Sequence, residues 1–389
     1  MGIATLNPSY KLMTDSISEF DLIRRYFTRA TPGALLGVGD DAALLQVSEG
    51  KVLAVSTDML VSGTHFFPDA DPYMLGHKTL AVNLSDMAAM GAMPRWATLA
   101  IALPRKDAAG ADEAWLERFS AGFFALAQQY GVELVGGDTT CGPLNLCVTI
   151  CGEVPARQAL RRSGAQIGDK IWVSGTLGDA ALALAHLQDR IVLKADEFAA
   201  CAPALHLPQP RIALGLALRG IASSAIDISD GLLGDLGHIL DASQVGAEID
   251  FALLPVSSVL RAQLTPPNLP NPSQPPQPLP ASPCQGRSRG GAREEPSFPP
   301  GSPPDKGAGG LGGLRGVKIF QQFVLSGGDD YELCFTAPAQ RHADVLSISA
   351  QLNLPLACIG RIVAGHGCTV HDASGNLIDM ETSGYDHFR

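Results

Sequence analysis

Two common nucleotide-binding signatures are missing from this sequence. No GxxxxGK[ST] loop is present, because the segment Gly76-His77-Lys78-Thr79 has no upstream glycine and lies inside a predicted helix. The HRD and DFG tripeptides of protein kinases are absent as well. These absences exclude the P-loop and protein-kinase classes.

The features of exported and membrane proteins are also missing. No apolar run approaches the roughly 20 residues needed to cross a bilayer, and the N-terminal segment lacks a basic stretch followed by an apolar core. Eight cysteines occur without a CxxC pair, and Cys147 and Cys151 alternate with apolar residues in a predicted strand. We expect a cytoplasmic protein with buried free thiols, in preference to disulfides or a zinc site.

Basic clusters are scarce. The formal net charge is -11, and no Lys/Arg-dense run occurs in the predicted folded part, so no nucleic-acid partner is expected. A content of 46% hydrophobic and 17% charged residues is typical of a globular protein. Because 389 residues exceed one typical core, we expect two domains.

Alternating strand and helix patterns predict the fold class. Short apolar runs bounded by turn residues predict strands at 51–57, 95–103, 132–135, 170–175, 223–229, 323–327, 332–337 and 355–363. Helical patterns lie between them, at 72–90, 111–129, 177–187 and 231–240. This alternation predicts α/β or α+β layered domains, which we place at 1–155 and 156–389.

Residues 265–316 differ from the rest of the chain. The proline density of TPPNLPNPSQPPQPLPASP excludes a helix or a central strand, and KGAGGLGGLRG is flexible. We interpret this stretch as a disordered insertion looped out of the second domain. An SH3-type partner for its prolines and a sequence or splicing artefact stay open as alternatives.

Five acidic clusters stand at turns or on one helix face. They are GVGDD at 37–41, STD at 56–58, NLSD at 83–86, GGDTT at 136–140 and DISDG at 227–231. Converging carboxylates repel one another and raise each other's pKa unless cations lie between them. Oxygen ligands of this kind suit magnesium, which is usually shared with substrate phosphates. The clusters therefore indicate metal-assisted phosphate chemistry.

Each cluster also has a purely structural interpretation. GDD is a common turn, and Asp230 alone could cap the helix that follows it, although this leaves Asp227 unexplained. His65 and Tyr385 are polar-tipped side chains among small or aromatic residues, and from the residues alone we interpret both as packing in preference to ligand contact.

The helix at 72–90 carries two stripes. Leu80, Leu84 and Met87 form a predicted core stripe, and a polar stripe made of Thr79, Asn83 and Asp86 runs beside it. Because this polar stripe has no Lys or Glu, we interpret it as facing a site, in preference to solvent.

Taken in order, these segments resemble the thiamine-phosphate kinase family of the aminoimidazole ribonucleotide synthetase-like ATP-binding superfamily. The resemblance rests on GVGDDAALL, STDMLVSGTHF, HKTLAVNLSDMAAMGAMP, VGGDTTCGPL, RRSGAQIGDKIWVSGTLGDAALAL, SSAIDISDGLLGDLGHI, LSGGDDYELCFT and GYDHF. It implies two domains, each a mixed sheet with packed helices, a homodimer that pairs through the N-terminal domain, and an active site between the domains.

The resemblance also implies roles for individual residues. Magnesium would be held by Asp41, Ser56, Thr57, Asp58, Asp86, Asp138, Asp227 and Asp230. ATP would contact Gly137, Asp138, Arg162 and Ser229. Thiamine monophosphate would contact His65, Asp329 and Tyr385, where Asp329 stands in place of a frequent family Glu.

The implied reaction converts ATP and thiamine monophosphate to ADP and thiamine diphosphate. A phosphate monoester has a second pKa of about 6, so the acceptor is largely a dianion at neutral pH and needs no general base. We expect direct in-line transfer assisted by magnesium, without a phosphoenzyme. The alternatives are a sister enzyme such as aminoimidazole ribonucleotide synthetase, and a silent, metal-dependent nucleotide-binding module.

Overall fold

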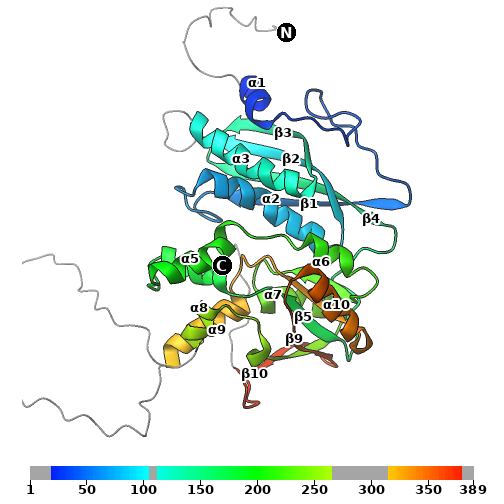
Figure 1. Cartoon of the computed structure of the whole chain (residues 1–389), viewed down its shortest axis with the longest axis vertical. Coiled ribbons are helices and arrows are strands. Elements are labelled where there is room, and N and C mark those ends of the chain that lie inside the picture. Colours follow the sequence, from blue (N-terminus) through cyan, green and yellow to red (C-terminus); the bar gives the residue numbers. More distant parts are fainter. Residues whose placement is uncertain (1–18, 105–111, 265–313, 379–389) are drawn as a thin grey trace, which may run out of the picture.

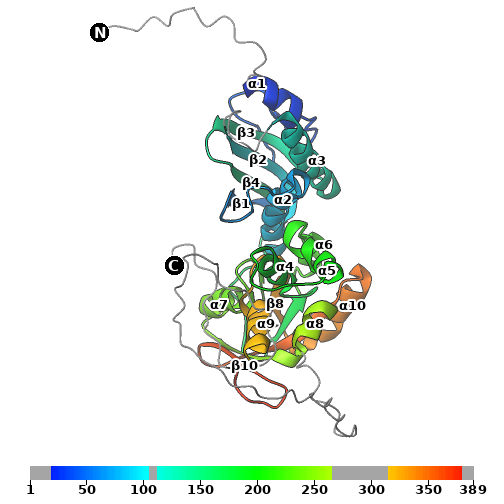
Figure 2. The same ribbon diagram turned by 90° about the vertical axis from the view of Figure 1, so that its left-hand side faces the viewer.

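The computed structural model describes residues 19–104, 112–264 and 314–378. Two sheets, each with its own helices, form two lobes that lie one above the other (Figures 1 and 2). Both sheets contain parallel and antiparallel strand pairs, which confirms the prediction of mixed sheets with packed helices.

The first lobe contains a four-stranded sheet in the order β1-β4-β2-β3. Its strands are β1 (Lys51–Val61), β2 (Met93–Leu103), β3 (Glu133–Cys141) and β4 (Asn145–Pro155). Helices α2 (Pro72–Ala89) and α3 (Glu113–Tyr130) lie on one face, and α1 (Glu19–Leu22) with the π-helical turn η1 (Ile23–Phe27) continues against α3. Alternate residues of β1, such as Val55 and Met59, point to the other face and are more than half exposed (57% and 55%).

The second lobe contains a six-stranded sheet in the order β10-β7-β9-β5-β8-β6. Its strands are β5 (Lys170–Ser174), β6 (Ser224–Asp227), β7 (Gly246–Asp250), β8 (Leu333–Ala337), β9 (Leu356–Val363) and β10 (Gly367–His371). Its helices are α4 (Asp179–Leu187), α5 (Ala195–His206), α6 (Ile212–Ala217), α7 (Leu232–Ser243), α8 (Ser258–Leu264), α9 (Leu314–Ser326) and α10 (His342–Leu352).

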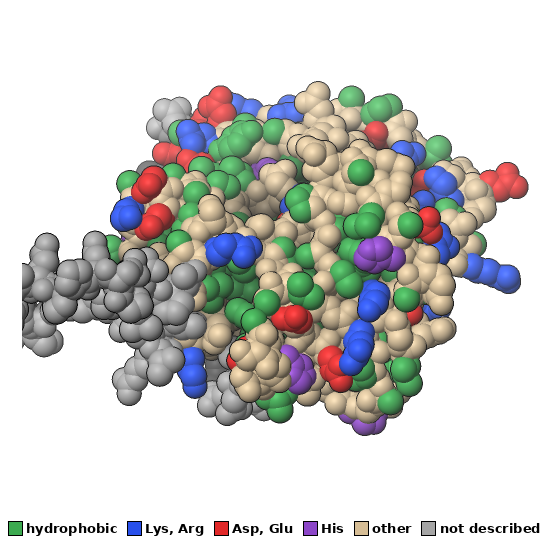
Figure 3. All heavy atoms as spheres, turned by 60° about the horizontal axis from the view of Figure 1, so that its bottom comes forward, with side chains coloured by type: hydrophobic (Ala, Val, Ile, Leu, Met, Phe, Trp, Pro, Cys, Tyr) green, Lys and Arg blue, Asp and Glu red, His purple; other side chains and the backbone are tan. Residues whose placement is uncertain are grey.

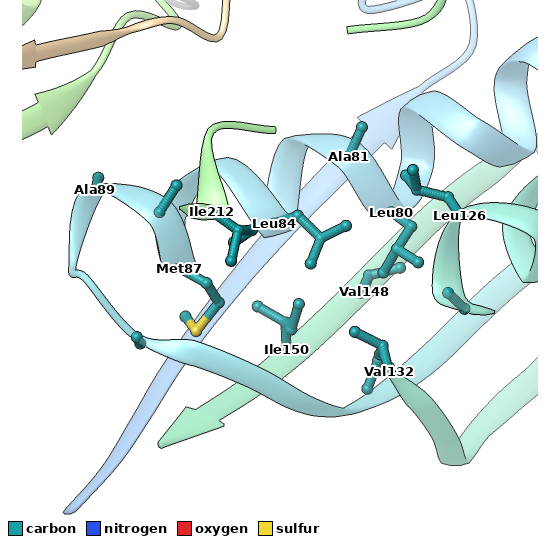
Figure 4. Close-up of a cluster of buried hydrophobic side chains, with 14 of the residues drawn as sticks. Leu80, Ala81, Leu84, Met87, Ala89, Leu126, Val132, Val148, Ile150 and Ile212 are labelled. Carbon is teal, nitrogen blue, oxygen red and sulfur yellow. The ribbon is translucent and has the colours of Figure 1, made fainter. Parts of the chain in front are cut away.

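Helix α2 packs against elements of both lobes. It begins where predicted, because the side chain of Asp71 accepts hydrogen bonds from the backbone N–H groups of Tyr73 and Met74. The predicted core stripe is confirmed: Leu80, Leu84 and Met87 are at most 1% exposed. Figure 4 shows this stripe pointing at Val148 and Ile150 of β4, with Ile212 of α6 beside it. One hydrophobic cluster thus runs from the first sheet through α2 into the second lobe.

One predicted strand is wrong. Residues 323–327 were expected to form a strand, but they mostly form the end of helix α9 (Leu314–Ser326). Phe320, Phe323 and Val324 recur at helical spacing and are buried, and a short apolar run does not by itself distinguish a buried helix from a strand. The predicted insertion 265–316 lies outside the described residues, except that its last three residues begin α9.

The prediction of buried free thiols is confirmed only in part. The seven cysteines of the described ranges are free, but only Cys201 and Cys334 are buried and Cys141 is exposed. Within the same ranges no helix is long and apolar enough to span a membrane. On the face shown in Figure 3, Lys and Arg side chains are interspersed with Asp and Glu.

Two glycines let α2 and α3 approach closely. A Cβ atom at Gly76 would overlap the carbonyl oxygen of Phe119, and one at Gly122 would overlap that of Tyr73. Neither backbone carbonyl can move without shifting its helix, so the packing of α2 on α3 requires both glycines.

Gly122→Ala is therefore expected to destabilise the protein by about 3 kcal/mol, because the added methyl forces the two helices apart. Urea unfolding followed by circular dichroism measures this. The matched control is Gly237→Ala in α7, where a Cβ has no neighbour within 4 Å. We expect Gly237→Ala to be neutral or to stabilise by up to about 1 kcal/mol, and equal effects of the two changes would contradict this packing account.

Candidate functional site

A large cavity lies between the two lobes. Its volume is about 1510 Å³, with walls from β1 and α2 on one side and from α4, α5, β6 and α9 on the other. The acidic residues among its described lining are Asp58, Asp69, Asp71, Asp86, Asp227, Asp230 and Asp329. The Lys and Arg residues among them are Lys78 and Arg190. The wall thus carries an excess of negative charge, which favours a cationic occupant.

A smaller cavity adjoins the large one. Its volume is about 490 Å³, and Asp86 lines both cavities. Ser56, Arg161 and Arg162 also form its wall. Burial raises the pKa of Asp86, and the hydrogen bond from Ser56 and the positive charge of Arg162 oppose the rise. The wall of this cavity thus combines cations and a hydroxyl with a carboxylate. Such a wall suits an anionic ligand that itself carries a metal ion.

Three carboxylates from three elements meet where the cavities join. Asp58 is on β1, Asp86 on α2 and Asp227 at the end of β6. Burial raises the pKa of Asp58 to about 7, and the charges of Asp86 and Asp227 add to the rise. Burial and the charge of Asp86 raise the pKa of Asp227 to about 7. The scaffold therefore holds these carboxyl groups together against their repulsion.

The alternation of β1 decides which side chains enter this cluster. Ser56 and Asp58 point toward α2, and the Ser56 hydroxyl donates to Oδ2 of Asp86 at 2.5 Å. The hydroxyl of Thr57 lies on the opposite face, 2.9 Å from Oγ1 of Thr149, although residue 57 also lines the large cavity.

The polar stripe predicted on α2 faces the site only at Asp86. Thr79 and Asn83 are 1% exposed, and Asn83 accepts a hydrogen bond from the backbone N–H of Asp58 at 3.3 Å. The face of α2 that lines the cavity is instead Lys78, Val82 and Asp86, at successive intervals of four residues.

The DISDG segment presents Asp230 to the cavity. The N-cap of α7 is Gly231, whose φ of 108° favours glycine, and not Asp230. Asp235 turns back and accepts from the backbone N–H groups of Ser229 and Asp230, both at 3.0 Å. The capping alternative for Asp230 is therefore wrong. Both Ser229 and Asp230 line the large cavity.

Three residues of the implied ligand set lie away from both cavities. Asp41 is exposed in the loop before β1, and Gly137 and Asp138 are on β3. Strand β3 is at the far edge from β1, so Asp138 lies about 14 Å from β1 across two intervening strands. A single chain does not bring these residues to the carboxylate cluster.

The implied substrate residues differ in how far the structure describes them. His65 lines the large cavity, and its Nδ1 accepts from the backbone N–H of Val61 at 3.0 Å. Asp329 also lines the cavity and has a left-handed φ of 69°. Tyr385 lies outside the described residues.

Sequence reasoning missed two cavity residues. Lys78 is 4% exposed and forms an ion pair with Asp329, with 3.2 Å between Nζ and Oδ1. Tyr331 is hydrogen-bonded to Asp329, and burial, followed by the charges of Asp329, Asp58 and Asp227, holds its pKa well above the usual value. The helical spacing that places Lys78 on the same face as Asp86 was a signal that could have predicted Lys78 in the cavity wall. Nothing in the local sequence marks Tyr331.

The described residues do not by themselves form a metal-binding geometry. Within the described ranges, no group of three or more His, Cys, Asp or Glu side chains has an arrangement that could hold a metal ion. Magnesium is commonly held by one or two carboxylates together with water and substrate phosphates, so oxygen donors from several elements still fit this ion.

Comparison with known proteins places the chain in a family. The family "AIR synthase related protein, N-terminal domain" matches residues 39–154, and "AIR synthase related protein, C-terminal domain" matches residues 166–373. The thiamine-monophosphate kinase of Escherichia coli (strain K12) is 44% identical over 376 residues, which cover 95% of this chain and 98% of the relative.

Solved structures agree with this placement. The thiamine-monophosphate kinase from Stenotrophomonas maltophilia K279a is 42% identical, with a TM-score of 0.69 over 89% of this chain and 93% of that chain. A structure described as AaThiL complexed with AMPPCP and TMP is 26% identical, with a TM-score of 0.66 over 98% of this chain and 100% of that chain. This chain therefore belongs to the thiamine-monophosphate kinase family and carries both AIR synthase related domains.

Proposed function

We propose that this protein transfers the γ-phosphoryl group of ATP to thiamine monophosphate, giving ADP and thiamine diphosphate. The main observation in favour is the carboxylate-lined cavity between the lobes, in a chain 44% identical to a thiamine-monophosphate kinase. The related structure in complex with AMPPCP and TMP supports the same pair of ligands. Direct in-line transfer follows from the acceptor, whose phosphate is nucleophilic without a general base.

The residues that the family resemblance implies divide into three proposed groups, and Asp41, Gly137 and Asp138 among them do not line either cavity of this chain. Metal ligands are Asp41, Ser56, Thr57, Asp58, Asp86, Asp138, Asp227 and Asp230; ATP contacts are Gly137, Asp138, Arg162 and Ser229; substrate contacts are His65, Asp329 and Tyr385. Arg162 in the smaller cavity supports nucleotide binding there, while His65 and Asp329 in the larger cavity support substrate binding there. Asp86, which lines both, would then lie between donor and acceptor.

The carboxylate cluster supports magnesium as the cofactor. Asp58 and Asp227 have pKa values raised to about 7, so in the metal-free protein they carry charge at considerable cost near neutral pH. Bound magnesium would supply positive charge that offsets these carboxylates and the phosphates of both substrates. The chain's own part is to hold Asp58, Asp86 and Asp227 in place and to orient Asp86 through Ser56.

A homodimer is proposed on separate grounds. The sheet face opposite α2 and α3 exposes Val55 and Met59, at 57% and 55%, and an uncovered apolar sheet face favours association. Asp138 pairs with Ala100, and both are exposed on this same face.

A cytoplasmic location is also proposed, supported by the use of ATP and by the free cysteines of the described ranges.

Asp230→Asn is expected to lower kcat for thiamine diphosphate formation by about 100-fold or more, because it removes a proposed metal ligand. The assay follows thiamine diphosphate by mass and ADP by a coupled reaction. Asp241→Asn, on the exposed side of α7, is the matched control and should leave kcat unchanged. Full activity of Asp230→Asn would remove this residue from the proposed site, and a wild-type protein that binds ATP without releasing ADP would favour the silent module.

The metal-free protein is expected to lose stability as pH rises through about 7. The folded state raises the pKa of Asp227 from 3.8 to about 7. The contribution of this protonated group to the stability of the folded protein is therefore present at low pH and is lost as the buried group ionises. Chemical unfolding in EDTA at pH 5 and pH 8 measures this. At pH 8 the free energy of unfolding of Asp227→Asn should exceed that of the wild type by on the order of 2 kcal/mol. Magnesium should restore the stability of the wild type. Parallel pH profiles of the two proteins would contradict the assignment.

Val55→Lys is expected to convert the proposed dimer to a monomer, because it places charge on the apolar sheet face. Light scattering coupled to size exclusion measures the mass. The matched control is Val192→Lys, at a residue 91% exposed outside the sheets. A wild-type monomer, or a Val55→Lys dimer, would contradict this interface.

A further inference from the structure

Lys78 occupies an unusual position in the cavity wall. Its side chain is only 6% exposed, whereas the other Lys or Arg in the described lining, Arg190, is exposed and lies over the ring of Phe323. A buried ammonium group is costly unless it is paired. Within the described ranges its ion-pair partner is Asp329, which comes from the other lobe.

The segment that carries Asp329 is held firmly. The backbone N–H groups of Asp329 and Tyr331 donate to the carbonyl oxygens of Ser229 and Ile228, both at 2.8 Å. The next side chains anchor separate elements: Asp330 accepts from the backbone N–H of Gly178 at 3.0 Å, and Glu332 accepts from Nε of Arg211 at 2.7 Å.

This anchoring is consistent with a functional position for Asp329. Asp329 and Tyr331 both have a left-handed φ, at 69° and 49°, which non-glycine residues rarely adopt. Strained backbone of this kind persists where surrounding contacts hold it, and it is concentrated at ligand sites. The fixed carboxylate in turn fixes the Lys78 ammonium.

Helix α2 fixes the position of the ammonium relative to the carboxylate cluster of Asp58, Asp86 and Asp227. Lys78, Val82 and Asp86 share the cavity face of α2, so Lys78 is two helical turns, or about 12 Å, from Asp86. Tyr331 lines the same cavity as Asp329, Asp58 and Asp227. An ammonium has three N–H donors, and Nζ of Lys78 lies 3.2 Å from Oδ1 of Asp329.

From this arrangement we infer that Lys78 binds the phosphate group of the acceptor. The inference rests on the proposed function and adds a residue to it. Lys78 would hold the phosphate from the side opposite the carboxylate cluster, and Asp329 would keep the ammonium in position. The inference explains why one buried cation is retained in a wall that is otherwise rich in carboxylates.

The test compares binding of thiamine monophosphate and of unphosphorylated thiamine by calorimetry, with magnesium and AMPPCP present. The quantity of interest is the phosphate preference, which is the ratio of the two affinities. Lys78→Met should lower this preference by about 10- to 100-fold, the usual range for one charge-assisted hydrogen bond, and Lys78→Arg should lower it less.

A second pair of variants separates phosphate binding from simple pairing with Asp329. In Asp329→Asn and in Lys78→Met/Asp329→Asn, no buried carboxylate is left without its ammonium partner. This comparison therefore also guards against misfolding of Lys78→Met, which leaves Asp329 unpaired. We expect the double variant to show about a 10- to 100-fold lower phosphate preference than Asp329→Asn.

Two results would overturn the inference. An unchanged preference in Lys78→Met, or a double variant equal to Asp329→Asn, would show that Lys78 only neutralises Asp329. In either case, a wild-type protein that binds thiamine monophosphate and turns it over would leave the proposed function intact. A wild-type protein that binds neither compound would overturn the inference and the proposed function together.

Discussion

The repulsion between buried carboxylates at the junction of the two lobes is the constraint on which the site depends. Asp58, Asp86 and Asp227 come from three separate elements, and burial raises the pKa of each. The charge of Asp86 adds to the rise at Asp58 and at Asp227. Carboxylates free to move would separate, so their proximity reflects a rigid scaffold. That scaffold is the hydrophobic cluster that runs from the first sheet through α2 into the second lobe. The packing energy of the lobes thus holds together carboxylates whose ionised forms are unfavourable there.

Helix α2 shows how one element serves both purposes. Its stripe of Leu80, Leu84 and Met87 packs on β4, and the adjacent face presents Lys78 and Asp86 to the cavity. Close packing against α3 through glycine fixes the rotation of the helix about its axis. Because side chains four residues apart lie on one face, this rotation places the ammonium and the carboxylate in the wall of the same cavity.

Much of the fold could be predicted from the sequence, because strongly patterned segments have few alternatives. Helix α2 combined an N-cap, a proline at its first position and a clear core stripe, and it was predicted within a residue. The end of α9 was misassigned because a five-residue apolar run fits a strand and a buried helix equally well. The chain from 265 to 313 lies outside the described residues.

The site was harder to predict than the fold. The acidic clusters singled out Asp58, Asp86, Asp227 and Asp230, which all line the large cavity, because short carboxylates at strand ends and on a core helix are unusual. Thr79 and Asn83 were assigned to the wrong face, since a difference of one residue rotates a helix position by 100°. Which carboxylates of distant segments meet is a property of sheet order, and no local pattern specifies that β3 lies at the edge far from β1.

The central claim is that the convergent carboxylates are there to bind divalent cations. Calorimetric titration with magnesium in two buffers of different ionisation enthalpy counts the protons that binding releases. Because Asp58 and Asp227 are partly protonated near neutral pH in the metal-free protein, the account predicts release of about one proton at pH 7 and tighter binding at pH 8 than at pH 6. Binding without proton release, and with equal affinity at both pH values, would contradict it.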